Sequence, residues 1–320
     1  LLQYVGAGET SDRFIQLGVD GGTGSSQIHA DGSGALILTN VNNTANTAAK
    51  TLFLRGANTA GNMITSALAD NTGALSVTVD GGATWILTGA NTYTGTTLVS
   101  AGALGIASST LGSGAGNLDL NNGTVFAYGA DRTVSNPVRL INNTTPAVSG
   151  DYSLAFTQPL QLLNAANNTG LNNNIVSGKT LTLAGATANS LPNNANRTWT
   201  IDGSGTTIIA GDITTTQTAA GGLNLTKTGD GVLVLGGTGG GANNFNRNNA
   251  AIDLDRGTIR LGASEVIGDG VDTQAVPVAY GGLTISPEAV TGDTATFDLN
   301  GQTETVNALT ATSNGTLVLD

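Results

Sequence analysis

The chain has 320 residues, including 47 Gly, 6 Pro and no Cys, and only 10% of its residues are charged. Without Cys these residues can form no disulfide, thiolate metal site or thiol nucleophile. Acidic residues outnumber basic ones by 22 to 11, so the basic footprint of a nucleic-acid-binding protein is missing. No apolar run approaches the roughly 18 residues of a membrane-spanning helix. We therefore expect no nucleic-acid partner and no membrane span in this chain.

The apolar residues lie in short runs rich in Val, Ile, Leu and Thr, separated by Gly and Asn turns. This pattern predicts strands, and no useful stretch shows the 3.6-residue period of a helix. In chain order, the predicted strands are residues 50–54, 73–78, 84–88, 96–99, 103–106, 179–183, 221–226, 231–236, 255–261 and 315–320.

Most of these strands occur in two copies. Four segments of the first copy recur in the same order in the second: 50–54, 73–78, 81–88 and 103–106 correspond to 179–183, 221–226, 229–236 and 255–261. The spacing between partners grows along the chain, as insertions between strands would produce. We therefore expect one continuous β-solenoid over 1–320, made of two diverged repeats at about 1–145 and about 146–320. Softer boundaries are expected near 142–150 and 189–197.

The best-preserved segments, residues 81–106 and 227–236, resemble the autotransporter-associated β-strand repeat of passenger regions in large bacterial surface proteins. Residues 2–13 and 297–306 resemble short sequence segments that recur beside this repeat in the same proteins. The resemblance implies an all-β protein folded as a right-handed parallel β-helix, a single elongated rod displayed outside the cell. The composition fits this fold, because short strands bury enough apolar surface only when they are stacked.

Candidate catalytic residues are few. His29 is the only His, and it is interpreted as a surface residue beside a turn, because a catalytic triad is defined by geometry and not by neighbours in sequence. Asp253 and Asp255 would share one face of a strand, with Arg256 and Arg260 nearby, which is the best acidic pair for a polysaccharide lyase or glycosidase.

The alternative for this pair is an ordinary solvated face opposite buried Ile252 and Leu254. We favour that alternative, because sugar-processing clefts usually expose aromatic rings, whereas Trp85 and Trp199 stand in apolar strand contexts that predict core positions. The sequence accordingly predicts no catalytic residue and a protein that is not an enzyme.

Metal and cofactor sites are likewise not expected. A single His cannot build a zinc site. Asp precedes Gly at six places, where oxygen ligands could hold calcium, but tight turns explain the pairs better because Asp and Gly tolerate left-handed backbone dihedrals. The six residues are Asp20, Asp31, Asp80, Asp202, Asp230 and Asp269.

Asn-rich segments suggest amide ladders, in which Asn side chains of successive turns stack along the axis. The residues concerned are Asn167, Asn168, Asn172, Asn173, Asn174, Asn193, Asn194, Asn248 and Asn249.

Three functions remain open. The first is a structural module of an extracellular fibre or long surface protein, continued end to end by flanking chain or by a neighbouring subunit, because an open solenoid end must be paired or capped. The second is an adhesin that binds a surface glycan or protein through lateral loops at 237–249 or 164–175. An enzyme of the lyase type is third.

Overall fold

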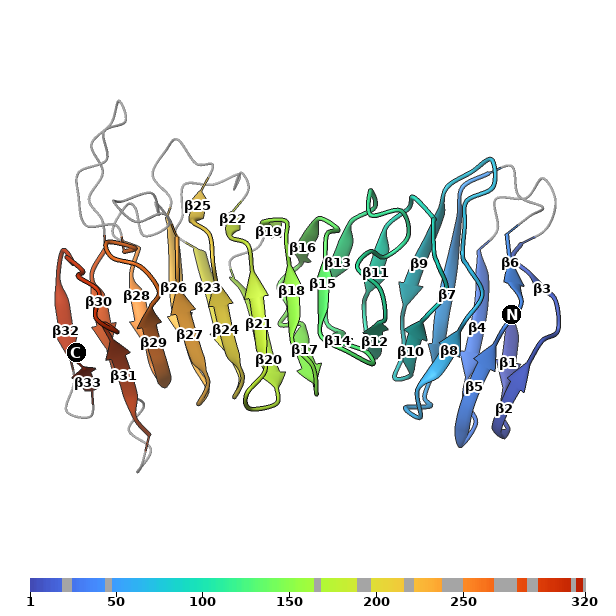
Figure 1. Ribbon diagram of the computed structural model, residues 1–320, viewed down its shortest axis with the longest axis horizontal. Helices are drawn as coiled ribbons and strands as arrows, with labels where there is room; N and C mark the ends of the chain where they lie inside the picture. Colours follow the sequence, from blue (N-terminus) through green and yellow to red (C-terminus); the bar gives the residue numbers. More distant parts are fainter. Residues whose placement is uncertain are drawn as a thin grey trace. The chain divides into compact units, whose positions relative to one another are not determined.

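The protein, shown as a computed structural model in Figure 1, consists of parallel strands that are stacked in register. The structure describes residues 1–18, 25–43, 48–163, 168–188, 197–215, 222–237, 250–267, 281–286, 293–311 and 315–318. They form two units, Leu1–Arg139 with Ser149–Thr157, and Leu140–Val148 with Gln158–Asp320. The described residues contain strands and turns but no helix, and so none that could cross a membrane.

The first unit contains two main parallel sheets. One sheet consists, in order, of β1 (Leu2–Tyr4), β4 (Ser26–Ala30), β7 (Lys50–Gly56), β9 (Leu75–Val79), β11 (Thr97–Val99) and β13 (Leu118–Leu120). The other consists of β2 (Ala7–Ser11), β5 (Gly34–Leu38), β8 (Asn62–Ile64), β10 (Thr84–Leu87), β12 (Ala103–Ile106) and β14 (Thr124–Ala127). Two short parallel pairs complete it, β3 (Ile15–Gln16) with β6 (Val41–Asn42) and β15 (Arg132–Val134) with β18 (Leu154–Phe156).

The second unit has three parallel sheets. The first sheet consists of β19 (Leu160–Leu163), β22 (Ala186–Ala188) and β25 (Ile213–Thr215). The second consists of β20 (Asn168–Ile175), β23 (Arg197–Asp202), β26 (Leu223–Lys227), β28 (Ile252–Leu254), β30 (Leu283–Ile285) and β32 (Leu309–Ala311). The third consists of β21 (Thr180–Leu183), β24 (Thr206–Ile209), β27 (Val232–Leu235), β29 (Gly257–Leu261), β31 (Ala295–Asp298) and β33 (Gly315–Val318). Strands β16 (Val138–Ile141) and β17 (Ala147–Gly150) each contain residues of both units. The predicted all-β parallel solenoid is confirmed.

Apolar ladders form the core. In the first unit the register places Ile28 beside Leu54, then Val79, Val99 and Leu120 on successive turns of the solenoid, and each is at most 1% exposed. A similar ladder in the second unit consists of Leu183, Ile209, Leu235 and Leu261. Each turn of the solenoid therefore buries its inward side chains on the next turn. The two Trp residues are fully buried, which confirms the predicted core positions.

One corner of the solenoid requires glycine on successive turns. Gly203, Gly229 and Gly257 follow one another at the same corner of successive turns of the second unit, with φ of 100°, 67° and 77°. A Cβ on Gly229 would lie 2.6 Å from the Gly203 backbone, and one on Gly257 would lie 2.4 Å from the Gly229 carbonyl oxygen. The corner therefore needs residues without a side chain for both its dihedrals and its close stacking.

The segment Asn91 to Gly95 of the first copy is anchored in the core by one residue. Tyr93 is fully buried, and its hydroxyl lies 2.7 Å from Thr97 Oγ1. Asp70 holds the segment from the preceding turn of the solenoid, because its carboxylate accepts hydrogen bonds from the Thr94 amide, the Thr94 hydroxyl and the Leu75 amide. Burial raises the pKa of Asp70, but these hydrogen bonds outweigh it and the net pKa is lowered. The buried Tyr93 ring and the Asp70 carboxylate therefore hold this turn of the repeat in place.

Candidate functional site

The acidic pair of the sequence does not form one site. Ile252 and Leu254 are fully buried and Asp253 is half-buried between them, as expected for a strand with a solvated face. Burial raises the pKa of Asp253, and a hydrogen bond with Thr284 opposes that shift. Asp255 follows the strand and lines a hollow of about 240 Å³ that Asp253 does not line.

The neighbouring arginines bind other carboxylates. The Arg256 guanidinium donates to both oxygens of Asp230, at 2.6 and 2.8 Å, and lies 3.7 Å from Asp293. Arg260 donates to Asp298 at 2.6 Å. The Asp253–Asp255 pair therefore lacks both a shared hollow and a free arginine.

A buried lysine organises the same corner. Lys227 is the last residue of β26 and is 1% exposed. Its Nζ donates to the carbonyl oxygens of Thr228, Gly229 and Arg256. Burial lowers the pKa of Lys227 to about 8, although the carboxylates of Asp202 and Asp230 act in the opposite direction. Two cations, Lys227 and Arg256, thus lie among four carboxylates at this corner, those of Asp202, Asp230, Asp255 and Asp293.

His29 lies on the outward face of β4, where its Nε2 is 3.4 Å from Gln27 Oε1 and its Nδ1 is 4.0 Å from Asp31 Oδ2. Among the described residues no hydrogen bond joins it to a serine hydroxyl, and its side chain is 26% exposed. The position agrees with a surface His beside a turn.

The Asp-Gly pairs serve turns in two ways. Gly81 and Gly203 adopt the positive φ expected after Asp, at 113° and 100°. Gly32 and Gly231 do not, and instead pass so close to a neighbouring backbone that a Cβ would lie 2.0 and 2.2 Å from carbonyl oxygens. Among the described residues no group of three or more His, Asp or Glu could hold a metal ion. Asp20 and Asp269 lie outside the described residues.

The predicted Asn ladder is wrong for residues 172–174. The buried Asn173 donates from Nδ2 to Thr207 Oγ1 and accepts from the Ile175 amide, while Asn174 accepts from the Ser204 amide. Asn172 is registered with Asp202 and not with another Asn. A ladder needs Asn at the same position of successive turns, and the next turn supplies Asp, Ser and Thr. Asn168 is registered with Thr198, and the remaining Asn residues of this prediction lie outside the described residues.

The structure also corrects the predicted loop at 164–175. Residues 168–175 form strand β20, which pairs with β23 over five positions. Hydrogen bonding to the next turn overrides the low strand propensity of Asn and Gly. Of the other predicted loop, 237–249, only Gly237 is described.

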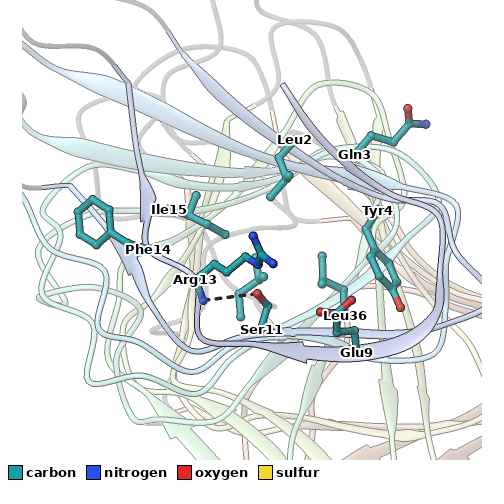
Figure 2. A pocket seen from close by; sticks show the side chains of 10 residues that line it. Leu2, Gln3, Tyr4, Glu9, Ser11, Arg13, Phe14, Ile15 and Leu36 are labelled. Atoms are coloured by element: carbon teal, nitrogen blue, oxygen red, sulfur yellow. Dashed lines mark hydrogen bonds between the residues drawn. The ribbon is translucent and has the colours of Figure 1, made fainter.

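The first turn of the solenoid encloses an open hollow of about 490 Å³, shown in Figure 2. Strands β1, β2 and β3 are the first members of their sheets. Leu2 is registered with Ile28 yet is 39% exposed, against 1% for Ile28. Glu9 and Ser11 stand at the positions that Leu36 and Leu38 occupy on the second turn, and Arg13 also lines the hollow. Within the described residues, the first turn therefore combines strand edges that have no partner with polar side chains at inward positions.

An outer groove of about 640 Å³ lies over β10, β12 and β14 of the first unit. Phe126 and Tyr128 project outward there, because Val125 and Ala127, which alternate with them along the chain, point into the core. Tyr152, Asp151 and the hydroxyl residues Thr84, Thr124 and Ser149 complete the lining. Sequence reasoning missed this groove because it judged the aromatic content of the whole chain. The alternation of residues 124–128 was the signal that could have found it.

The fold and these sites define a class: a parallel β-solenoid whose turns carry repeats typical of bacterial passenger regions. Residues 77–106 and 225–246 match the passenger-associated transport repeat, which confirms the resemblance seen in the sequence. The first match runs from β9 to the end of β12.

A particular relative is the Adhesin BmaC autotransporter of Brucella suis biovar 1 (strain 1330), which is 37% identical over 109 residues. This match covers 33% of the chain but only 3% of the adhesin, so the chain corresponds to a small part of that protein. No solved structure matches the chain.

Proposed function

We propose that this chain is a non-enzymatic scaffold segment of a long, adhesin-type protein on the bacterial surface. The observation that carries the proposal is that the passenger repeat coincides with stacked turns of the solenoid. The matched residues 77–106 include the end of β9 and all of β10 to β12, and β9 pairs with β11 while β10 pairs with β12. Such a unit can be repeated along a chain without limit, because each turn contacts only its neighbours.

We propose that flanking chain continues the solenoid at the first turn. The edges of β1, β2 and β3 and the exposed Leu2 support continuation, because unpaired strand edges and apolar ends need cover. The inward Glu9 and Arg13 favour a covering segment with complementary polar groups over a second copy of this chain, whose stacking would bury those charges. Similarity to a much longer protein agrees with continuation.

The absence of catalysis is part of the proposal. It is supported by the separation of Asp253 from the hollow beside Asp255 and by the pairing of Arg256 and Arg260 with other carboxylates. An activity screen on polysaccharides, with Asp255→Asn as the comparison, would contradict the proposal if cleavage occurred and depended on Asp255.

Surface display is tested by inserting a short epitope next to Gly178 in the full-length protein. Gly178 is exposed, and a Cβ there would meet nothing within 4 Å, so the turn has room for an insertion. We expect an antibody to label intact cells, while the same epitope on a cytoplasmic protein is labelled only after lysis. Labelling of this protein only after lysis would refute the proposal.

A further inference from the structure

The outer groove of the first unit is a built aromatic surface. The register places Ile86, Gly105 and Phe126 side by side on successive turns of the solenoid. A Cβ on Gly105 would lie 2.8 Å from both Ile86 Cγ1 and Phe126 Cζ, so the Phe126 ring extends over the glycine. On the other side, a Cβ on Gly150 would lie 3.1 Å from Phe126 Cβ. The two glycines thus leave the space in which a bulky ring can lie against the sheet.

Polar groups surround this ring. The lining includes the phenol groups of Tyr128 and Tyr152, the Asp151 carboxylate and the hydroxyls of Thr84, Thr124 and Ser149. None of these side chains has a hydrogen-bond partner within the described part of the chain. They are therefore free to donate to and accept from a ligand. The volume of about 640 Å³ lies in the range of small-molecule sites.

From this arrangement we propose that the groove binds a neutral glycan. Sugar rings are flat enough to lie on aromatic side chains and carry many hydroxyls, which match the phenol, hydroxyl and carboxylate groups of the lining. The only charged residue of the lining is Asp151, and the chain carries 22 acidic against 11 basic residues. This charge disfavours nucleic acids and sulfated or sialylated glycans, whose recognition needs cations.

This inference deepens the proposed function, because a glycan ligand outside the cell is reached only if the chain is displayed there. It places the binding surface on strands β10, β12, β14 and β17 and on the turns that follow β14 and β17, whereas the lateral loops at 237–249 or 164–175 were the expectation from sequence.

The test uses the purified 320-residue chain and an array of immobilised oligosaccharides. The array has neutral hexose and N-acetylhexosamine members, and also sialylated and sulfated ones. We expect binding to neutral members, which is then quantified by titration. Phe126→Ala and Tyr152→Ala should each weaken that binding about tenfold or more, as loss of an aromatic anchor does. Tyr152→Phe, which keeps the ring, should retain more affinity than Tyr152→Ala.

Phe14→Ala is the matched control, because Phe14 is a 60% exposed aromatic residue outside the groove. Circular dichroism and melting temperature establish that each variant is folded. The proposal is overturned if no neutral glycan binds, if only anionic glycans bind, or if folded groove variants bind as tightly as the control. The binding assay is independent of surface labelling, so failure of one leaves the other result standing.

Discussion

Lys227 places an ammonium group at an inward strand position, between Ile201 and Leu254 of the neighbouring turns of the solenoid. Three carbonyl oxygens of the glycine corner accept its hydrogen bonds, so the residue ties the corner of one turn to that of the next. Its role differs from that of a surface lysine, because a change in its charge alters the electrostatic energy of a buried group and therefore the stability of the fold.

This burial predicts a pH dependence. The pKa of Lys227 is about 8 in the folded chain, below its ordinary value of 10.5. Between these two values the unfolded chain binds more protons than the folded chain, so the contribution of Lys227 to stability rises with pH in that window. Below pH 8 both states are protonated and the cost of burying the charge is fully present.

The measurement compares urea unfolding of wild type and Lys227→Met at pH 7 and pH 10. We expect wild type to gain stability relative to the variant as the pH rises. Other titrating groups cancel in this comparison. Equal pH dependence of the two proteins would show that Lys227 keeps an ordinary pKa in the fold.

The sequence analysis missed the inward direction of Lys227 and the outward direction of Phe126 and Tyr128, although the alternation of residues 124–128 signals the second. Lys227 stands at the end of a predicted strand, where a lysine normally faces water, and only the register with Ile201 and Leu254 shows that it points inward. For Phe126 and Tyr128 the difference is reversed: aromatic residues in or beside a strand normally indicate core positions, yet these two point outward. Their outward direction follows from the burial of Val125 and Ala127.

Among the elements, strands were easier to predict than the segments between them. Predicted strands 84–88, 96–99 and 103–106 agree with β10, β11 and β12 to within one residue at either end. Their alternation and flanking glycines are local signals. Strand β20 was mistaken for a loop because its pairing with β23 is a long-range contact that Asn-rich composition does not reveal.

The glycine corner gives the prediction at this scale. Gly229→Ala would combine a positive φ of 67° with a Cβ only 2.5 Å from Asp202 Oδ1 and 2.6 Å from the Gly203 backbone. Backbone cannot move away without displacing the stacked corner, so we expect a loss of about 3 kcal/mol or more in the free energy of unfolding.

Gly178→Ala is the matched control, because Gly178 has a similar φ of 81° but nothing within 4 Å of its Cβ position. It should cost only the dihedral strain, about 1–2 kcal/mol. Chemical denaturation of both variants measures the difference. Equal destabilisation would mean that the corner relaxes and that stacking does not require glycine there.

For the whole molecule, the two-copy pattern and the short apolar runs predicted stacked strands, because such strands have few other ways to bury their apolar faces. That the strands are parallel was implied by the resemblance to the passenger repeat. The hollow at the first turn was beyond this reasoning. Its character depends on which residues of β2 point inward, and the register with β5 decides that Glu9 and Ser11 do so.

Those inward polar residues predict how the isolated chain behaves at this end. Strand edges invite association, and inward-pointing charges are one way in which natural sheets prevent it. We expect the wild-type chain to stay monomeric in sedimentation velocity experiments from micromolar to high micromolar concentration.

Glu9→Leu combined with Arg13→Leu gives the first turn an apolar hollow like the core of the second, so this double variant should associate with increasing concentration. Asp12→Leu is the control, because Asp12 is on the same turn but does not line the hollow. If wild type assembled end to end as readily as the double variant, Glu9 and Arg13 would not oppose stacking of two copies, and a second copy would become the better candidate for the cover.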